Sequence, residues 1–119
     1  MPLPGFAQAT VGAQIAKMPI AGQVNPRSAL VFERGSIQVK LYAPRDRDPQ
    51  TPHSRDELYF IASGRGKFLC DGKTTDFGPG DMLFVAAGLE HRFLDFTDDI
   101  AIWVVFYGPE GGETEKAKR

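Results

Sequence analysis

Cysteine and histidine are the scarce residue types with chemical consequences in this sequence of 119 residues. Cys70 is the only cysteine, so no internal disulfide can form. His53 and His91 are the only histidines, so any site that requires imidazole must use one or both of them. At this length one domain with one hydrophobic core can fold without disulfides.

Long hydrophobic runs and an excess of charge of one sign are also missing. No run of about 18 apolar residues occurs, which excludes a membrane-spanning helix. The 14 basic and 15 acidic residues leave a net charge of -1, so we expect no nucleic-acid partner. The amino-terminal residues lack the basic flank and apolar stretch of a secretory signal, and a lone cysteine fits a reducing compartment. We therefore expect a cytoplasmic protein with no membrane partner.

Three segments of different character follow one another along the chain. Residues 1–27 form an amino-terminal extension, in which small and apolar residues at roughly helical spacing predict a short helix over 6–17. From residue 28 to residue 107 the apolar periodicity changes to two, which is typical of β-strands. Residues 108–119 are polar and glycine-rich, and we expect them to be a mobile tail.

Short strands joined by tight turns account for the central segment. In residues 36–42 apolar and polar side chains alternate, and Asp71-Gly72 is a strong hairpin signal. Residues 100–107 are apolar on both faces, so a second sheet or a partner subunit must cover them. This pattern predicts an all-β fold, an antiparallel sandwich or barrel. Further strands are expected over 58–62, 67–70, 82–86, 91–96 and 100–107.

The two histidines and one glutamate are the candidate metal ligands. Glu57 follows His53 after three intervening residues, at the point where a predicted strand begins. His91 opens a later strand and shares a face with Phe93, so it should point inward together with that ring. Two imidazoles and one carboxylate suit Zn, Fe, Mn or Ni and leave coordination positions open for water or substrate.

The spacing of these residues resembles the two sequence motifs of the cupin superfamily. The second half of the first motif, G-x5-H-x-H-x3,4-E-x6-G, reads here His53-x3-Glu57-x6-Gly64. The second motif, G-x5-P-x-G-x2-H-x3-N, reads Gly80-x5-Ala86-x-Gly88-x2-His91-x3-Asp95. The resemblance implies a double-stranded β-helix, a jelly-roll barrel over residues 28–107 with one divalent metal ion inside.

The chain departs from the motifs at three positions. Arg45 stands in place of the first glycine and Ala86 in place of the proline. Thr51 stands where the family has its first histidine, which reduces a four-ligand site to three protein ligands. Gln50 and Thr51 remain as weaker candidates, because each offers a neutral oxygen.

Aromatic residues supply candidates for a pocket wall and for a subunit contact. Tyr59, Phe84, Phe93 and Trp103 are the pocket candidates, and alternation from Glu57 favours Tyr59 among them. The same alternation turns Leu58 and Phe60 outward, which favours a homodimer. Asp56, just before Glu57, is expected to face solvent or an arginine.

Three functions are compatible with these residues. The first is a metal-binding protein that acts on a small molecule, for example as a dioxygenase or isomerase. The second is a module that binds or senses a small ligand without turning it over. The third is a metal-free structural barrel. The fold alone does not choose among them.

Overall fold

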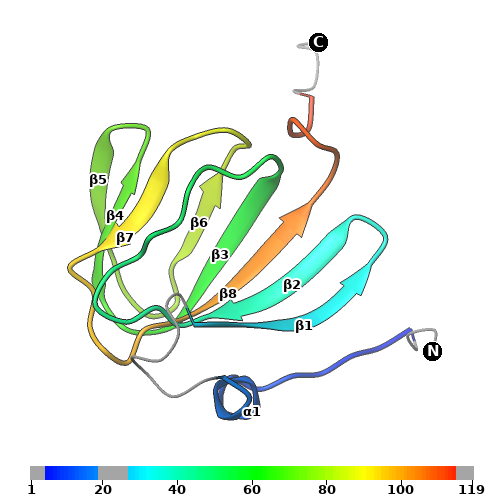
Figure 1. Ribbon diagram of the computed structural model, residues 1–119, viewed down its shortest axis with the longest axis horizontal. Helices are drawn as coiled ribbons and strands as arrows, with labels where there is room; N and C mark the ends of the chain where they lie inside the picture. Colours follow the sequence, from blue (N-terminus) through cyan, green and yellow to red (C-terminus); the bar gives the residue numbers. More distant parts are fainter. Residues whose placement is uncertain (1–4, 19–26, 115–119) are drawn as a thin grey trace.

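The computed structural model describes residues 5–18 and 27–114, and within them the regular structure is antiparallel β-sheet with one short helix (Figure 1). This confirms the predicted all-β barrel with a short helix. The elements are α1 (Val11–Ala16), β1 (Ser28–Arg34), β2 (Ile37–Tyr42), β3 (Asp56–Ser63), β4 (Gly66–Cys70), β5 (Lys73–Phe77), β6 (Met82–Val85), β7 (His91–Leu94) and β8 (Ala101–Tyr107).

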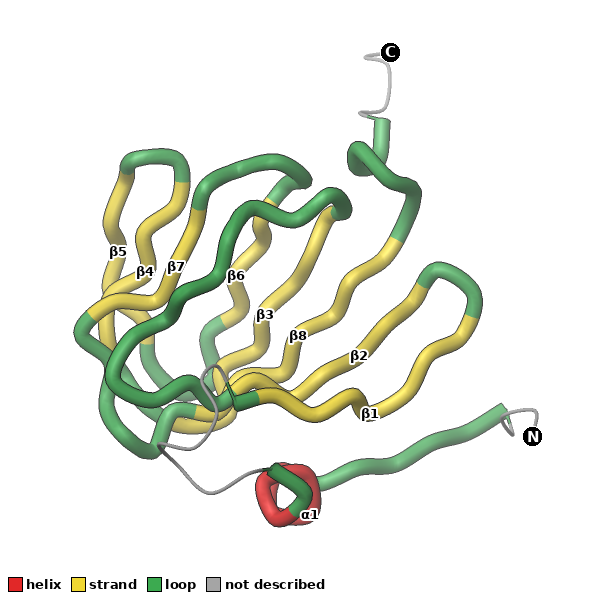
Figure 2. Tube along the Cα trace, in the orientation of Figure 1, coloured by secondary structure: helices red, strands yellow, loops and turns green. Residues whose placement is uncertain are grey.

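Two sheets of unequal size form the barrel (Figure 2). The larger has the order β1-β2-β8-β3-β6 and the smaller has the order β5-β4-β7. Aromatic side chains fill the space between them, since the ring of Tyr59 on β3 lies 5.7 Å from Phe68 on β4 and 5.0 Å from Phe93 on β7. The two sheets therefore share one core.

The turn between β4 and β5 consists of two residues with positive φ angles. Asp71 and Gly72 have φ angles of 51° and 79°, and they join β4 to β5 with Cys70 paired to Lys73. This confirms the predicted hairpin. The strand after the turn, β5, was not among the predicted strands, because only Phe77 of its five residues is buried and the rest are exposed.

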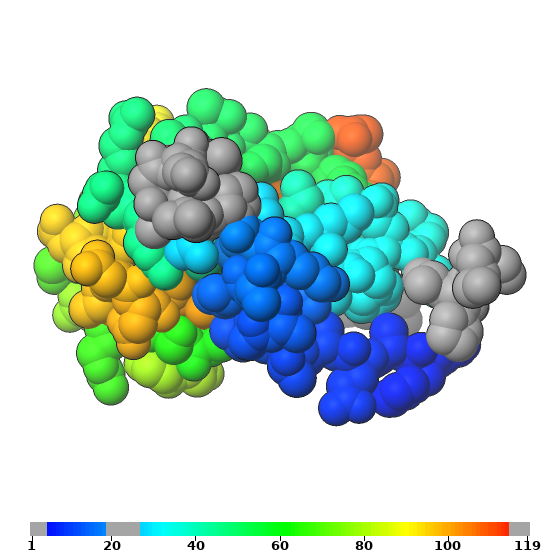
Figure 3. Space-filling view, turned by 60° about the horizontal axis from the view of Figure 1, so that its bottom comes forward, coloured from blue at the N-terminus to red at the C-terminus, as the bar shows by residue number. Residues whose placement is uncertain are grey.

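The predicted helix over 6–17 is wrong at its start. The helix α1 begins at Val11, because the Thr10 side chain accepts a hydrogen bond from Ala13 N and so caps the helix there. Phe6 lies outside the helix and is 72% exposed. The helix α1 packs against β1 and β2, as the blue and cyan surfaces in Figure 3 show. Within residues 5–18 and 27–114, no helix is long and apolar enough to cross a membrane.

The segment after β8 returns to the start of β3. Gly111 N donates to the Ser54 carbonyl, and Glu113 N donates to Asp56 Oδ2 at 2.8 Å. Asp56 is thus buried and bonded to backbone amides, which corrects the expectation that it faces solvent. The last part of the expected tail, residues 115–119, lies outside the described residues.

Candidate metal centre

Two connections of the backbone bring the histidines together. His53 lies in the loop before β3, and its carbonyl accepts a hydrogen bond from Gly88 N at 2.8 Å in the turn between β6 and β7. His91 begins β7 immediately after that turn, and Glu57 is the second residue of β3. Residues 38 positions apart therefore meet at one end of the barrel.

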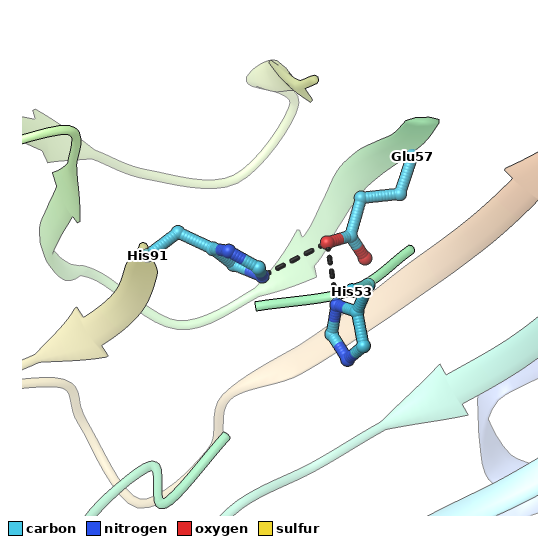
Figure 4. Close-up of side chains that lie close together, drawn as sticks. All are labelled: His53, Glu57 and His91. Carbon is cyan, nitrogen blue, oxygen red and sulfur yellow. Dashed lines mark hydrogen bonds and ion pairs between the residues drawn. The ribbon is translucent and has the colours of Figure 1, made fainter. Parts of the chain in front are cut away.

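His53, Glu57 and His91 converge on one carboxylate oxygen (Figure 4). Glu57 Oε1 lies 2.9 Å from His53 Nδ1 and 2.8 Å from His91 Nε2. One donor atom from each residue can be chosen so that all three lie within 4.8 Å of one another. This is the size of a site that one metal ion can occupy.

The three side chains of the cluster differ in how deeply they are buried. Glu57 and His91 have side chains only 1% exposed, whereas the His53 side chain is 34% exposed. His91 Nδ1 donates to the Leu89 carbonyl at 2.8 Å, so its Nε2 is directed at Glu57. The ring of His53 rests against Phe106, with centroids 5.0 Å apart.

Burial and the mutual contacts act in opposite directions on the charges of the cluster. Burial by itself would raise the pKa of Glu57, but the hydrogen bond from His53, the close contact with His91 and the charge attraction of both outweigh it and lower that pKa. Burial would lower the pKa of His91, but the contacts with Glu57 and the Leu89 carbonyl raise it. In the metal-free cluster these contacts therefore stabilise the charged forms of both Glu57 and His91.

Two buried polar atoms of the cluster have no hydrogen-bond partner, Glu57 Oε2 and His91 Nε2. The His91 nitrogen lies close to Glu57 Oε1 but without the alignment of a hydrogen bond. Unpaired buried polar atoms are costly and call for an explanation. An ion bound to both would satisfy them, so the residues present fit a divalent metal.

A pocket of about 160 Å³ opens beside the cluster. Its polar wall includes Gln50 and Tyr59, and the Tyr59 hydroxyl donates to Gln50 Oε1 at 3.1 Å. Burial, followed by the charge of Glu57, raises the pKa of Tyr59, so this phenol stays protonated. The complete lining is Ser28, Lys40, Tyr42, Gln50, His53, Glu57, Tyr59, Val104 and Phe106.

Asp48 fixes the loop that carries Gln50. It is 4% exposed and accepts hydrogen bonds from the Tyr42 hydroxyl, the Gln50 side-chain amide and the backbone N–H of Phe93. Burial and then Asp48 raise the pKa of Tyr42. The network ties the loop to both sheets, because Tyr42 lies on β2 and Phe93 on β7.

The structure separates the remaining site candidates. Gln50 lines the pocket with its side chain bonded to Asp48 and Tyr59, whereas Thr51 is exposed. Of the aromatic candidates, only Tyr59 lines the pocket. Phe93 is buried in the core between the sheets, and Phe84 is 51% exposed on β6. Trp103 lines a shallow hollow on the outer face of the larger sheet, together with Phe60.

Sequence reasoning missed Lys40, Tyr42 and Asp48. Lys40 and Tyr42 are the polar members of the alternating strand β2, so the alternation held a signal for them. Asp48 lies in an irregular loop, where no periodicity applies. Only the folded chain brings it next to Phe93, 45 residues away.

Comparison with known proteins gives a consistent family assignment. The sequence model of the Cupin domain family matches residues 38–107. An uncharacterized protein of Streptomyces coelicolor is 38% identical over 77 residues, which are 63% of this chain and 73% of that protein. The solved structure of a Cupin 2 conserved barrel domain protein from Salinispora arenicola has a TM-score of 0.66 at 17% identity. It covers 88% of this chain and 91% of that one.

A shorter similarity points to one enzyme. Acireductone dioxygenase of Rhodopseudomonas palustris is 47% identical over 45 residues. The match covers 34% of this chain and only 27% of the dioxygenase, so the similarity extends over a part of each protein.

Proposed function

The chain belongs to the cupin superfamily, and on that basis we propose that it binds one divalent metal ion through His53, Glu57 and His91. The observation that carries this proposal is the pair of buried atoms without hydrogen-bond partners, Glu57 Oε2 and His91 Nε2, in a cluster with three donor atoms within 4.8 Å of one another. Fe, Mn, Ni and Zn all accept two imidazoles and one carboxylate. Three protein ligands leave positions open for a small organic molecule.

We propose that the pocket places this small molecule for a dioxygenase or isomerase reaction. A bound ion supplies a Lewis acid and an anchor for substrate oxygen atoms. Gln50 and the protonated Tyr59 lie beside the cluster, where they orient polar groups of the ligand. The local similarity to acireductone dioxygenase supports an oxygen-dependent reaction within this class.

A binding or sensing module is the second candidate, and a metal-free structural barrel is the third. The pocket of about 160 Å³ favours a small ligand under either of the first two. Oxygen consumption by the iron-loaded protein with a panel of small phenols, diketones and thiols distinguishes an enzyme from a binding module. Uptake with one compound supports the enzyme, whereas silence with stable ligand binding supports the module.

Metal content per chain tests the proposed site directly. Protein purified without a histidine tag should hold close to one ion, and Glu57→Gln and His91→Ala should hold almost none. Glu90→Gln is the matched control, because Glu90 is an exposed carboxylate next to His91 that contacts Arg92 instead of the cluster. Equal trace metal in all four proteins would reject the site and favour the structural barrel.

We also propose a homodimer formed through the outer face of the larger sheet. Phe60, Met82 and Phe84 are 41%, 56% and 51% exposed there, and Phe60 pairs with Met82 across the β3–β6 ladder. Light scattering should give twice the chain mass for the wild type and the chain mass for Phe84→Lys. Leu30→Lys should stay dimeric, because Leu30 is 50% exposed and pairs with the pocket-lining Lys40, on the opposite face of the larger sheet. A monomeric wild type at micromolar concentration would reject the dimer.

We propose a cytoplasmic location from the single cysteine, Cys70, which is a free thiol. Fractionation of the native host cells tests this directly. Recovery of the protein from a fraction other than the cytoplasm would contradict it.

A further inference from the structure

Lys40 stands where two cavities of the barrel meet. The inner pocket, about 160 Å³, holds Glu57 and Tyr59, and a second cavity of about 280 Å³ is lined by Arg55 and Glu110. Both cavities are lined by Lys40, His53 and Phe106, so they adjoin one another at these residues. A ligand in the inner pocket therefore lies against Lys40 as well as against His53 and Glu57.

Strand geometry places the Lys40 side chain on the pocket face of β2. Side chains alternate along β2, and Lys40 and Tyr42 share the face that lines the inner pocket. Lys40 pairs with Val104 of β8, and its Nζ lies 5.9 Å from the centre of the Phe106 ring. Lys40 therefore lines the inner pocket, with its ammonium group near the Phe106 ring that both cavities share.

A second cation reaches the same ring. The Cζ atom of Arg55 lies 5.8 Å from the centre of Phe106, and its Nη1 donates to the Ser36 carbonyl. Contact with an aromatic face leaves the full positive charge of a cation in place. Two positive charges consequently face the outer cavity.

No carboxylate of the described residues neutralises these charges. Neither Lys40 nor Arg55 lies in an ion pair within residues 5–18 and 27–114, in contrast to Lys67, whose Nζ lies 2.8 Å from Asp76. The carboxylate of Glu57 is engaged by the two histidines. Glu110 lines the outer cavity without contacting either cation. The two cations and one carboxylate therefore leave an excess of positive charge at the outer cavity.

We infer that Lys40 binds the carboxylate of a small organic anion whose other end reaches the His53–Glu57–His91 cluster. An ammonium group in a partly enclosed pocket binds a carboxylate through charge-assisted hydrogen bonds, which are stronger than neutral ones. The inner pocket is smaller than the roughly 300–1,000 Å³ typical of sites for drug-sized ligands, so the anion is small. The position of its far end rests on the proposed metal site, whereas recognition by Lys40 does not.

The test compares 4-oxopentanoate with its neutral amide, 4-oxopentanamide, in NMR titrations of the metal-free protein. The two compounds have nearly the same shape and differ in charge. We expect the wild type to bind the carboxylate at least about tenfold more tightly than the amide, because hydrogen bonds to charged groups contribute that much. The preference should weaken as salt is added.

Variants assign the preference to Lys40. Lys40→Met keeps the length of the stem and removes the charge, and it should reduce the preference to less than about twofold. Lys40→Arg keeps the charge and should retain the preference, as should Lys67→Met, which removes a lysine paired elsewhere. Glu110→Gln should increase the preference for the carboxylate, because it removes the negative charge of Glu110 from the outer cavity. Dispersed amide spectra verify that each variant is folded.

Three results would overturn the inference. They are equal affinity for both compounds in the wild type, a preference retained in Lys40→Met, and no response to either compound up to its solubility limit. Zinc content, measured on zinc-loaded samples of the same proteins, reports separately on the metal site. A wild type that binds no zinc rejects the proposed function, yet the carboxylate preference of the metal-free protein still decides the role of Lys40.

Discussion

Glu57 Oε1 lies 2.8 Å from His91 Nε2, and both side chains are 1% exposed. The two residues come from different sheets, β3 in the larger and β7 in the smaller. Their contact therefore joins the two halves of the barrel as well as forming the core of the candidate metal centre.

This contact makes the stability of the metal-free protein depend on pH in two opposite ways. The pKa of Glu57 is lowered in the folded state, so its contribution is lost as pH falls through that value. The pKa of His91 is raised, so its contribution is complete below the unfolded value of about 6.5 and is lost as pH rises through the folded value. Urea unfolding with a chelator present should show maximal stability between these two ranges.

Glu57→Gln provides the control for that profile. It removes the negative charge that raises the pKa of His91, so the loss of stability on the alkaline side should shrink. A metal-free wild type whose stability keeps rising above a pH of about 7 would contradict the prediction. Metal retention should follow a different course and decline as pH falls, because bound histidines must be deprotonated.

Asp48→Asn should destabilise the fold by about 2–3 kcal/mol, because an amide group would then face donors that need an acceptor. The Phe93 N–H, 2.9 Å from Asp48 Oδ2, is buried and has no route to water. Urea unfolding measures the change. Asp76→Asn is the matched control, since Asp76 is 83% exposed and pairs with Lys67 at the surface, and it should cost less than about 0.5 kcal/mol. Equal effects of the two substitutions would argue against the Asp48 network.

Gly64→Ala should destabilise the protein by at least about 3 kcal/mol, through a strained backbone and a steric clash. Gly64 has φ +93°, and a Cβ there would lie 2.6 Å from the Ile100 Cα. Gly72→Ala has a comparable φ of +79° but open space around it, so it should cost only about 1 kcal/mol. Thermal unfolding of the two variants separates the clash from the strain, and similar losses would rule the clash out.

Asp56→Asn should loosen the segment after β8. The carboxylate accepts hydrogen bonds from Ala87 N and Glu113 N, and an amide can accept only one of them without turning a donor toward the other. Amide hydrogen exchange at Glu113 should accelerate, while the core of β8 is unchanged. Asp98→Asn, at an exposed position, should leave exchange at Glu113 as in the wild type. Unchanged exchange in Asp56→Asn would mean that other contacts hold the segment.

The Cys70 thiol should react slowly with a disulfide reagent at neutral pH. Burial, followed by the charges of Asp71 and Glu57, raises its pKa, so little reactive thiolate is present. Reaction should reach the rate of an ordinary cysteine when the protein is unfolded in urea. Equally fast reaction in the folded state would contradict this account.

Local patterns explain what the sequence predicted well. The hairpin at Asp71-Gly72 depends on two adjacent residues with positive φ, and the inward direction of His91 and Phe93 depends on alternation within one strand. The spacing of His53 and Glu57 is likewise a property of one short segment. Such features are decided over a few residues, so the sequence contains them.

Features that depend on the register between strands could not be predicted from the sequence in this way. The alternation over residues 36–42 predicted a strand, but it did not reveal that Lys40 and Tyr42, the polar members, line the pocket. Phe84 pairs with Leu58 across the β3–β6 ladder and so shares its outward direction. Trp103 pairs with Phe60 in the same way. Unless the residue pairs between two strands are known, the side-chain directions in one strand do not determine those in its neighbour.

The position of β8 has a consequence for biosynthesis. This strand follows all the others in sequence, yet it lies between β2 and β3 in the larger sheet and supplies Val104 and Phe106 to the pocket. Until residue 107 has left the ribosome, β1 and β2 have no connection to β3 and β6 within that sheet. The nascent chain can form the β1–β2 and β3–β6 pairs earlier, but it can join the two pairs and close the barrel only in a late step.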